Sequence, residues 1–252
     1  MTQYDYNGKV AIVTGGGSGI GEACAVTMGS SGARVIVADY DKDGGERVTE
    51  AIKGDGGEAS FVMVDVSKPD QVEAMVKAAV DTYGGLHVAV NNAGIGGAQA
   101  PTSEYPIDAW EQVIGINLSG VFYGLRYEIP AMIESGGGSI VNMASILGSV
   151  GFAQSVGYVA AKHGVVGMTK TAAIEHSSQG VRVNAVGPGF INTPLIEENL
   201  DQDMLTALVG MHPIGRLGEA QEVAELVTFL GSDSASFCTG GYYVVDGAYT
   251  AQ

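Results

Sequence analysis

Short apolar runs alternate with longer amphipathic stretches along the whole chain. The chain is α/β in pattern, because seven runs rich in valine, isoleucine and alanine predict strands at residues 9–14, 34–39, 59–66, 86–91, 139–143, 182–186 and 242–246. These runs are apolar on both faces, which is typical of parallel strands covered by helices on each side. The intervening stretches predict helices, including 21–30 and two long apolar helices at 108–133 and 155–176. The alternation predicts one doubly wound domain over residues 1–252.

The most irregular stretch of the chain covers residues 187–213, with a short helical candidate at 194–209 inside it. A long excursion late in an α/β chain is often a lid over a ligand. We therefore expect a substrate lid at about residues 190–212.

Composition and charge narrow the class of protein. Hydrophobic residues make up 46% of the chain and charged residues 16%, so it can bury a core. The formal net charge of -16 disfavours nucleic acid and anionic membranes as partners. Cys24 and Cys238 have no metal-ligand spacing, so we expect no metal site and two reduced thiols. With no apolar leader or membrane-length run, a cytoplasmic location is expected.

A glycine-rich turn, TGGGSGIG at residues 14–21, follows the first predicted strand and opens the first helix. Glycines at positions 15, 19 and 21 allow a sharp turn and bring the backbone close to a pyrophosphate at a helix N-terminus. Such turns also occur without a ligand. The position directly after the first strand favours dinucleotide binding.

Asp39 ends the second predicted strand, 24 residues after Gly15. A carboxylate there can accept hydrogen bonds from the adenosine ribose hydroxyls, and it would repel a 2′-phosphate. No basic residue lies in the glycine-rich turn, and Lys42 is the nearest one that could weaken the argument. The alternative is a solvent-exposed Asp at a strand end, but its pairing with the turn favours NAD over NADP.

Tyr158 and Lys162 are spaced i,i+4 and lie on one face of a predicted helix. An ammonium near a phenol favours the phenolate, which suits acid–base catalysis near neutral pH. Such pairs are more often surface pairs, but Ser145 follows the fifth strand, at the sheet edge where α/β proteins bind ligands. Asn117 lies in an apolar helix and is either a buried kink or a holder of water; the pattern does not decide between them.

In this order the motifs resemble those of the short-chain dehydrogenase/reductase family over the entire chain. The matching residues are TGGGSGIG at 14–21, Asp65 and Val66, NNAG at 91–94, Asn117, Ser145, YVAAK at 158–162 and GPGFINT at 187–193. Gly187 departs from the Asn, Ser or Cys that the family often has there. The resemblance implies a Rossmann-like, seven-stranded parallel sheet and a homotetramer.

The resemblance also implies roles for individual residues. Asn117, Ser145, Tyr158 and Lys162 are implied to be catalytic, with Asn117 holding a water that links Lys162 to solvent. Asp65 and Val66 would hold the adenine, while Asn91 would help line the ribose and brace the fourth strand. The implied NAD contacts are Gly15, Gly17, Ser18, Gly19, Ile20, Asp39, Asp65, Val66, Asn92, Ala93, Gly94, Tyr158, Lys162, Pro188, Gly189, Ile191 and Thr193.

The favoured function is an NAD(H)-dependent oxidoreductase that moves a hydride between nicotinamide and a secondary alcohol or ketone. A 3-oxoacyl-acyl-carrier-protein reductase is the alternative, disfavoured by Asp39 and the acidic charge. A catalytically silent NAD-binding regulator is more remote, because Ser145, Tyr158 and Lys162 are all present. The expected substrate is an apolar or amphipathic small molecule, and the candidate lining residues are Ile95, Gly96, Ile146, Leu147, Phe152, Phe190, Leu195, Ile196 and Met204.

Overall fold

A central parallel sheet organises the molecule, which a computed structural model describes for residues 4–193 and 202–251. Seven strands are hydrogen-bonded in the order β3-β2-β1-β4-β5-β6-β9, and all of the pairs are parallel. Their bounds are β1 Val10–Thr14, β2 Arg34–Asp39, β3 Glu58–Met63, β4 Val88–Asn91, β5 Gly138–Met143, β6 Val181–Pro188 and β9 Tyr242–Val245. The predicted Rossmann-like, seven-stranded α/β fold is confirmed.

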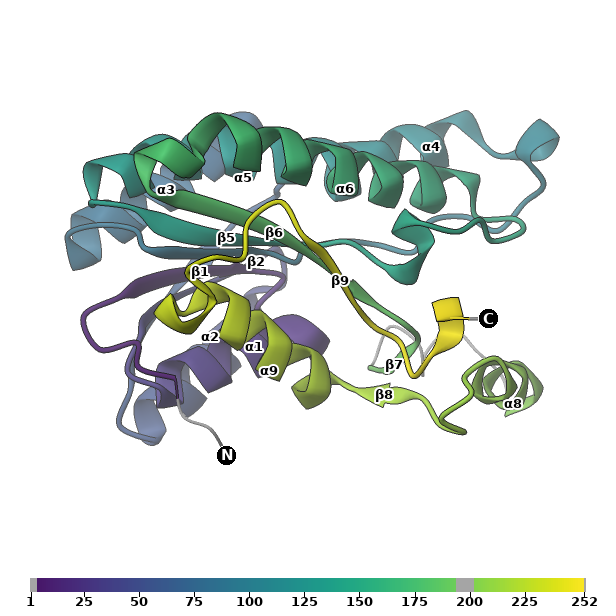
Figure 1. The fold of residues 1–252 in the computed structure, drawn as a ribbon, viewed down its shortest axis with the longest axis horizontal. Coiled ribbons are helices and arrows are strands. Elements are labelled where there is room, and N and C mark those ends of the chain that lie inside the picture. The colour runs from purple at the N-terminus through teal and green to yellow at the C-terminus, as the bar shows by residue number, and fades with distance from the viewer. Residues whose placement is uncertain (1–3, 194–201, 252) are drawn as a thin grey trace.

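Helices cover both faces of this sheet (Figure 1). One layer contains α1 Gly19–Ser30, α2 Lys42–Gly54 and α9 Ala220–Gly231, and the opposite layer contains α3 Pro69–Tyr83, α4 Ile107–Ile114, α5 Gly120–Glu134 and α6 Val156–His176. Near the carboxyl ends of the strands lie α8 Gln202–Gly210 and a small parallel pair, β7 Ile191–Asn192 with β8 Gly218–Glu219.

Neighbouring strand residues belong to two separate cores. Ile140 packs in the core that contains Val121 of α5, whereas the next residue, Val141, packs in the core that contains Val227 of α9. Successive strand side chains point to opposite faces, so a sheet buried on both sides needs continuous apolar strands. This explains why the seven runs could be recognised without any alternation.

Several predicted boundaries were wrong. The third strand ends at Met63 rather than at residue 66, because Asp65 accepts hydrogen bonds from the backbone N and the Oγ of Ser67 (2.9 and 2.7 Å) and forms a polar turn. The helix predicted over 108–133 is interrupted by a π-helical turn, Gly115–Ser119, between α4 and α5. The helix predicted at 194–209 is represented by α8, and residues 194–201 of that prediction lie outside the described residues.

Candidate functional site

The glycine-rich turn lies between β1 and α1, next to the point where the strand order reverses from β1 to β4. Gly15 and Gly19 have φ values of +61° and +54°, in the left-handed region that favours glycine. A Cβ at Gly21 would lie 1.9 Å from the Gly15 carbonyl oxygen, so that position has no room for a side chain. Ser18 precedes α1 without a side-chain cap, which suits backbone N–H groups that receive a phosphate.

The Asp39 carboxylate faces the same turn from the end of β2. Its two oxygens accept hydrogen bonds from the backbone N–H groups of Gly17 (2.8 Å) and Asp41 (2.9 Å). A Cβ added to Gly17 would lie 2.9 Å from an Asp39 oxygen. The glycine therefore leaves a narrow backbone surface beside a carboxylate, which fits a ribose diol.

The basic residue nearest this site is not the one expected. Lys42 is exposed and pairs with Glu46 on its own helix (3.7 Å). Arg47, one turn later in α2, instead binds the Gly17 carbonyl (2.9 Å) and both oxygens of Glu22 (2.6 Å each). No local pattern predicts this contact, because Glu22 and Arg47 come from different helices.

The end of β4 braces the glycine-rich turn. Asn92 Nδ2 donates to the carbonyls of Thr14 (3.0 Å) and Gly15 (3.2 Å), and the Asn92 and Ala93 N–H groups both donate to Thr14 Oγ1 (3.0 and 3.1 Å). Thr14 was not among the predicted site residues. Gly94, exposed, follows directly and lies beside Asn117. The NNAG segment thus positions the phosphate loop through hydrogen bonds of Asn92 and Ala93 with Thr14 and Gly15.

Asn91 belongs to the interior rather than to the surface of the site. Its Nδ2 donates to Glu128 (2.9 Å) and to Asn142 Oδ1 (3.0 Å), which joins β4 to α5 and β5. This geometry agrees with bracing of the fourth strand, and it uses the Asn91 amide for contacts within the core.

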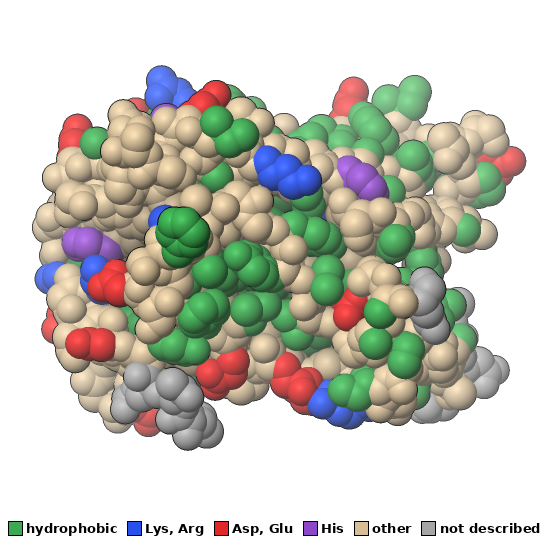
Figure 2. Space-filling model, viewed as in Figure 1, with side chains coloured by type: hydrophobic (Ala, Val, Ile, Leu, Met, Phe, Trp, Pro, Cys, Tyr) green, Lys and Arg blue, Asp and Glu red, His purple; other side chains and the backbone are tan. Residues whose placement is uncertain are grey.

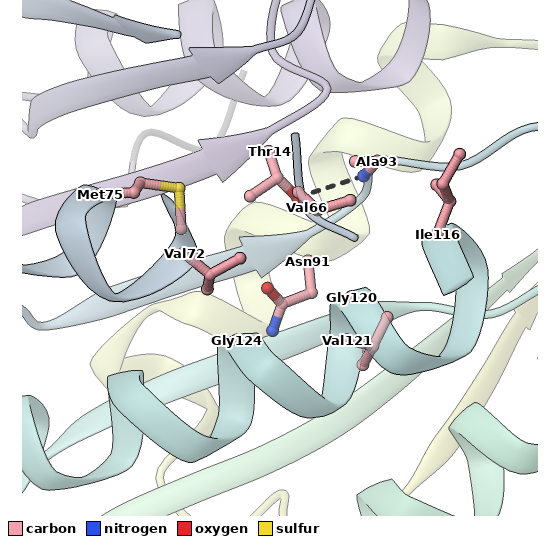
Figure 3. A pocket seen from close by; sticks show the side chains of 10 residues that line it. All are labelled: Thr14, Val66, Val72, Met75, Asn91, Ala93, Ile116, Gly120, Val121 and Gly124. Atoms are coloured by element: carbon pink, nitrogen blue, oxygen red, sulfur yellow. Dashed lines mark hydrogen bonds between the residues drawn. The ribbon is translucent and has the colours of Figure 1, made fainter. Parts of the chain in front are cut away.

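A small cavity of about 10 Å³ lies between the ends of β1 and β4 and the start of α5, and Figure 3 shows the residues that line it. Val66 and Ala93 both line it. The cavity has room for about one water molecule and is far too small for a purine. Val66 and Ala93 nevertheless border the same gap, and their contact with a cofactor stays a prediction.

Ser145 and Tyr158 meet beyond the end of β5. Ser145 is buried and caps a short 3₁₀ turn, Ile146–Gly148, by accepting a hydrogen bond from the Leu147 N–H (3.2 Å). Burial raises the pKa of Tyr158 above its usual value, and a hydrogen bond with the Ser145 side chain lowers it in part. The hydroxyl that was predicted to donate a proton is therefore in contact with the serine that was predicted to orient the substrate oxygen.

Lys162 is buried one turn below Tyr158 in α6. Its Nζ donates to the Met143 carbonyl (2.7 Å) and lies 5.4 Å from the centroid of the Tyr158 ring. Burial lowers the pKa of Lys162 to about 8. The charge of this ammonium is expected to favour the phenolate of Tyr158, but burial is the larger influence and leaves the pKa of Tyr158 above its usual value.

Asn117 lies in the π-helical turn between α4 and α5 and is completely buried. Its Oδ1 accepts from the Ile95 N–H (2.9 Å) and its Nδ2 donates to the Ile95 carbonyl (2.8 Å). The side chain thus holds the loop after β4. Of the two interpretations left open by the sequence, the helix distortion is present, and the water-holding role stays a prediction.

The segment after β6 crosses the open side of the site. The Gly189 N–H donates to the Val245 carbonyl (2.9 Å), and a Cβ at Gly189 would lie 2.9 Å from His212 Nε2. Ile191 is buried in β7, and Thr193 lies next to Gly19 of the phosphate loop. The structure therefore brings the predicted residues from Pro188 to Thr193 to the same edge of the sheet as the glycine-rich turn.

Four aromatic rings form a cluster at this edge. Phe190 lies 5.9 Å from Phe152, 5.8 Å from His212 and 6.0 Å from Tyr249, measured between ring centroids. His212 is buried, contacts the Leu208 carbonyl through Nδ1 (2.8 Å), and accepts a hydrogen bond from the Phe190 N–H at Nε2 (3.3 Å). We call Phe152, Phe190, His212 and Tyr249 the aromatic wall; His212 and Tyr249 were not predicted for the site.

The other predicted lining residues differ in their accessibility. Ile146 and Leu147 are buried in the 3₁₀ turn after Ser145, Ile95 is half-buried, and Gly96 is exposed. Leu195 and Ile196 lie outside the described residues, as does the side chain of Met204. Ile146 and Leu147 thus pack in the turn that Ser145 caps and offer little surface to a substrate.

Tyr242 explains the unusual Gly187. A Cβ at Gly187 would lie 2.6 Å from the Tyr242 ring. The Tyr242 hydroxyl donates to the Ser145 carbonyl (2.5 Å). Gly187 therefore admits a ring whose hydroxyl holds the backbone of Ser145.

Neither a metal-ligand cluster nor a membrane-spanning helix is present in the described part of the chain. No group of three or more His, Cys, Asp and Glu side chains is placed to hold a metal ion in residues 4–193 and 202–251. In the same part of the chain, no helix combines the length and the apolar character needed to cross a bilayer.

Comparisons with known proteins agree over nearly the whole chain. The model of the family described as Enoyl-(Acyl carrier protein) reductase matches residues 15–250. The chain is 49% identical over 247 residues to a cyclohexanol dehydrogenase of Acinetobacter sp. (strain SE19), covering 98% of this chain and 97% of that protein. It is 43% identical over 250 residues to a 2,5-dichloro-2,5-cyclohexadiene-1,4-diol dehydrogenase of Sphingobium indicum, covering 98% and 99%. The crystal structure of levodione reductase, 38% identical, matches with a TM-score of 0.95 and covers 98% of this chain and 99% of that one.

Proposed function

Since the chain belongs to the short-chain dehydrogenase/reductase family and is an oxidoreductase, we propose that it transfers a hydride between NAD(H) and a cyclic secondary alcohol or its ketone. The observation that carries the proposal is the contact between Ser145 and Tyr158 above the buried Lys162. An alcohol oxygen that displaces the Ser145 contact could exchange a proton with Tyr158. The bound nicotinamide supplies or accepts the hydride.

The protein residues would supply orientation and a proton. In reduction, Tyr158 gives its hydroxyl proton to the substrate oxygen, while Ser145 holds that oxygen with a hydrogen bond. In oxidation, Tyr158 accepts the proton of the alcohol. Lys162 lies beneath the ring and, with its pKa near 8, carries its charge at neutral pH. Its charge favours the negative form of Tyr158 as the proton leaves.

The choice of NAD rests on the surface around the phosphate loop. The pyrophosphate would bind at the glycine-rich turn, and the adenosine ribose would bind at Asp39. The Asp39 oxygens are directed at the Gly17 N–H and the following loop, so a 2′-phosphate would meet a carboxylate at short range. Arg47, the cation beside this position, is already paired with Glu22.

A cyclic substrate is suggested by the relatives and by the aromatic wall. The names of the two curated relatives specify a cyclohexanol and a cyclohexadiene-diol as their substrates. Rings such as those of Phe152 and Phe190, half-buried beside the segment after β6, offer apolar surface to an alicyclic ring. The test is a panel of cyclohexanol, substituted cyclohexanols and linear secondary alcohols of equal carbon number, followed by NADH absorbance. Equal efficiency on the linear alcohols would refute the cyclic preference.

A second candidate is reduction of a thioester-linked 3-oxoacyl chain, because the matching family model is described as an acyl-carrier-protein reductase. An acidic carrier protein would approach a chain whose formal net charge is -16, and like charges oppose that encounter. Activity on a 3-oxoacyl carrier protein above that on cyclohexanone would favour this candidate. A silent NAD-binding role is disfavoured by the complete set of Ser145, Tyr158 and Lys162.

The homotetramer stays a prediction, with two apolar surfaces that support it. Ile107, Trp110 and Phe122 are exposed on α4 and α5, and Phe237 and Val244 are exposed beside β9. On the face seen in Figure 2, hydrophobic side chains gather over α9 and β9. Two separate self-complementary surfaces are what 222 symmetry needs. Light scattering should give about four times the 25.8 kDa chain mass, whereas a monomeric mass would contradict the assembly.

We further propose that the chain acts as a single catalytic domain with a lid near residues 190–212. Helix α8 lies within that range. It is joined to the aromatic wall because His212 Nδ1 contacts the Leu208 carbonyl. The cytoplasmic location also stays a prediction.

A further inference from the structure

An ion pair binds the outer side of the phosphate loop. Arg47 of α2 places one guanidinium nitrogen 2.6 Å from one oxygen of Glu22 and the other nitrogen 2.6 Å from the second oxygen. The latter nitrogen also donates to the Gly17 carbonyl at 2.9 Å. The side chains are part-exposed, at 56% for Arg47 and 31% for Glu22. A bidentate pair of this kind fixes the guanidinium in one orientation.

The same residue, Gly17, links this pair to the expected ribose site. The Gly17 N–H donates to Asp39 (2.8 Å), while the Gly17 carbonyl accepts from Arg47 (2.9 Å). The Arg47 guanidinium and the Asp39 carboxylate therefore lie on the two sides of one residue of the phosphate loop. The negative charge of Asp41 also acts on Arg47. A cation that could bind a phosphate is thus adjacent to the adenosine end of the site and is surrounded by carboxylates.

We propose that Glu22 is a cofactor-specificity residue, which, by pairing with Arg47, keeps that cation from binding the 2′-phosphate of NADP. This inference rests on the proposed use of NAD. Asp39 repels the phosphate directly, and Glu22 withholds the neighbouring guanidinium that could attract it. Exclusion of NADP then depends on two carboxylates, one at the end of β2 and one in the first turn of α1.

A purely structural role for the pair leads to a different expectation. If Glu22 and Arg47 only fasten α2 to the loop, neutralising Glu22 loosens the loop and weakens NAD and NADP binding alike. If Glu22 withholds Arg47, its neutralisation strengthens binding of 2′-phosphorylated ligands alone. The two roles are therefore separated by the ratio of the two affinities.

The experiment measures binding by calorimetry on the full chain, with NAD⁺, NADP⁺ and adenosine 2′,5′-bisphosphate as probes. The reference is Asp39→Ala, which removes the direct repulsion. Adding Glu22→Gln should raise the affinity for NADP⁺ and for the bisphosphate by about tenfold, the size of one charge-assisted hydrogen bond, with NAD⁺ affinity changed by less than about threefold. Adding Arg47→Gln to that double variant should abolish the gain.

Glu46→Gln in the Asp39→Ala background is the matched control. It removes one negative charge from α2, where Glu46 pairs with Lys42, and should change NADP⁺ affinity by less than about twofold. A gain that persists without Arg47, an equal gain from Glu46→Gln, or no gain from Glu22→Gln would each overturn the inference. Failure of NAD⁺ to bind the wild-type chain would instead overturn the proposed function.

Discussion

The Tyr242 hydroxyl donates a hydrogen bond to the carbonyl of Ser145 at 2.5 Å, across 97 positions of the chain. The last strand of the sheet thereby holds the backbone of the residue that would orient the substrate. The Tyr242 ring can reach this position because residue 187, on the neighbouring strand β6, is glycine. The departure from the family pattern at residue 187 is thus matched by a contact that holds the backbone of Ser145.

Tyr242→Phe should lower kcat by about three- to tenfold, because it removes one hydrogen bond, worth about 1 kcal/mol, that positions Ser145. The KM for NAD⁺ should be unchanged, because the contacts of Tyr242 are with Ser145 and Gly187 and not with the phosphate loop. Steady-state kinetics measure both constants. Tyr243→Phe, whose ring packs in the opposite core, is the control, and equal kcat values for the two variants would count against a positioning role.

The wild-type protein should use NADH more efficiently than NADPH by at least about 10²-fold, the size of a few kcal/mol of charge repulsion at Asp39. The measurement is kcat/KM for each cofactor with one ketone at fixed ionic strength. Comparable efficiencies with the two cofactors would contradict the proposed NAD preference.

Glu128 should make the protein less stable as the pH rises. The side chain is completely buried, one of its oxygens has no hydrogen-bond partner, and burial raises its pKa from 4.5 to about 7. Below about pH 4.5 the carboxyl is protonated in both the folded and the unfolded chain. As the pH rises from there to about 7, ionisation favours the unfolded chain, and the loss of folding free energy is on the order of 3 kcal/mol.

Glu128→Gln removes this titration. The free energy of unfolding of the variant, relative to wild type, should therefore increase between pH 5 and pH 8, measured by urea unfolding. Glu134→Gln changes an exposed residue at the end of the same helix and should follow the wild-type profile. Parallel profiles for Glu128→Gln and wild type would show that the carboxyl is not protonated in the folded protein.

The lid prediction concerns α8 and its contact with His212. We expect residues 205–211 to exchange their amide hydrogens more slowly when cofactor and substrate are bound, because closure would bury this helix against the site. Exchange in α9, which packs in the core, should be unaffected. Equal protection of residues 205–211 with and without ligands would argue that the segment is a fixed wall.

Much of the fold could be predicted because its signals are local. The strands at the centre of the sheet, such as β1 and β4, are buried and continuous apolar runs, and the phosphate loop is a contiguous glycine motif between β1 and α1. Tyr158 and Lys162 are one helical turn apart, so their proximity followed from spacing alone. Ser145 could be placed because parallel strands end at the same edge of a sheet.

The contacts that were missed join residues far apart in the chain. Tyr242 binds Ser145, Arg47 binds Glu22, and His212 binds the backbone of Phe190. No periodicity relates such partners, so only the folded chain reveals them. Lys42, the nearest basic residue along the sequence, pairs with Glu46, whereas Arg47 contacts the loop. The face of a helix, and not distance along the sequence, decides which cation reaches the loop.

The central claim is that Tyr158 transfers the proton, and the variant Tyr158→Phe tests it most directly. It keeps the ring above Lys162 and removes only the hydroxyl that contacts Ser145. Turnover of a ring alcohol such as cyclohexanol with NAD⁺ should fall by at least about 10³-fold, within the range expected for acid–base catalysis. NADH binding, followed by fluorescence titration, should be unchanged. A Tyr158→Phe variant that binds NADH and retains more than about a tenth of wild-type turnover would contradict the account.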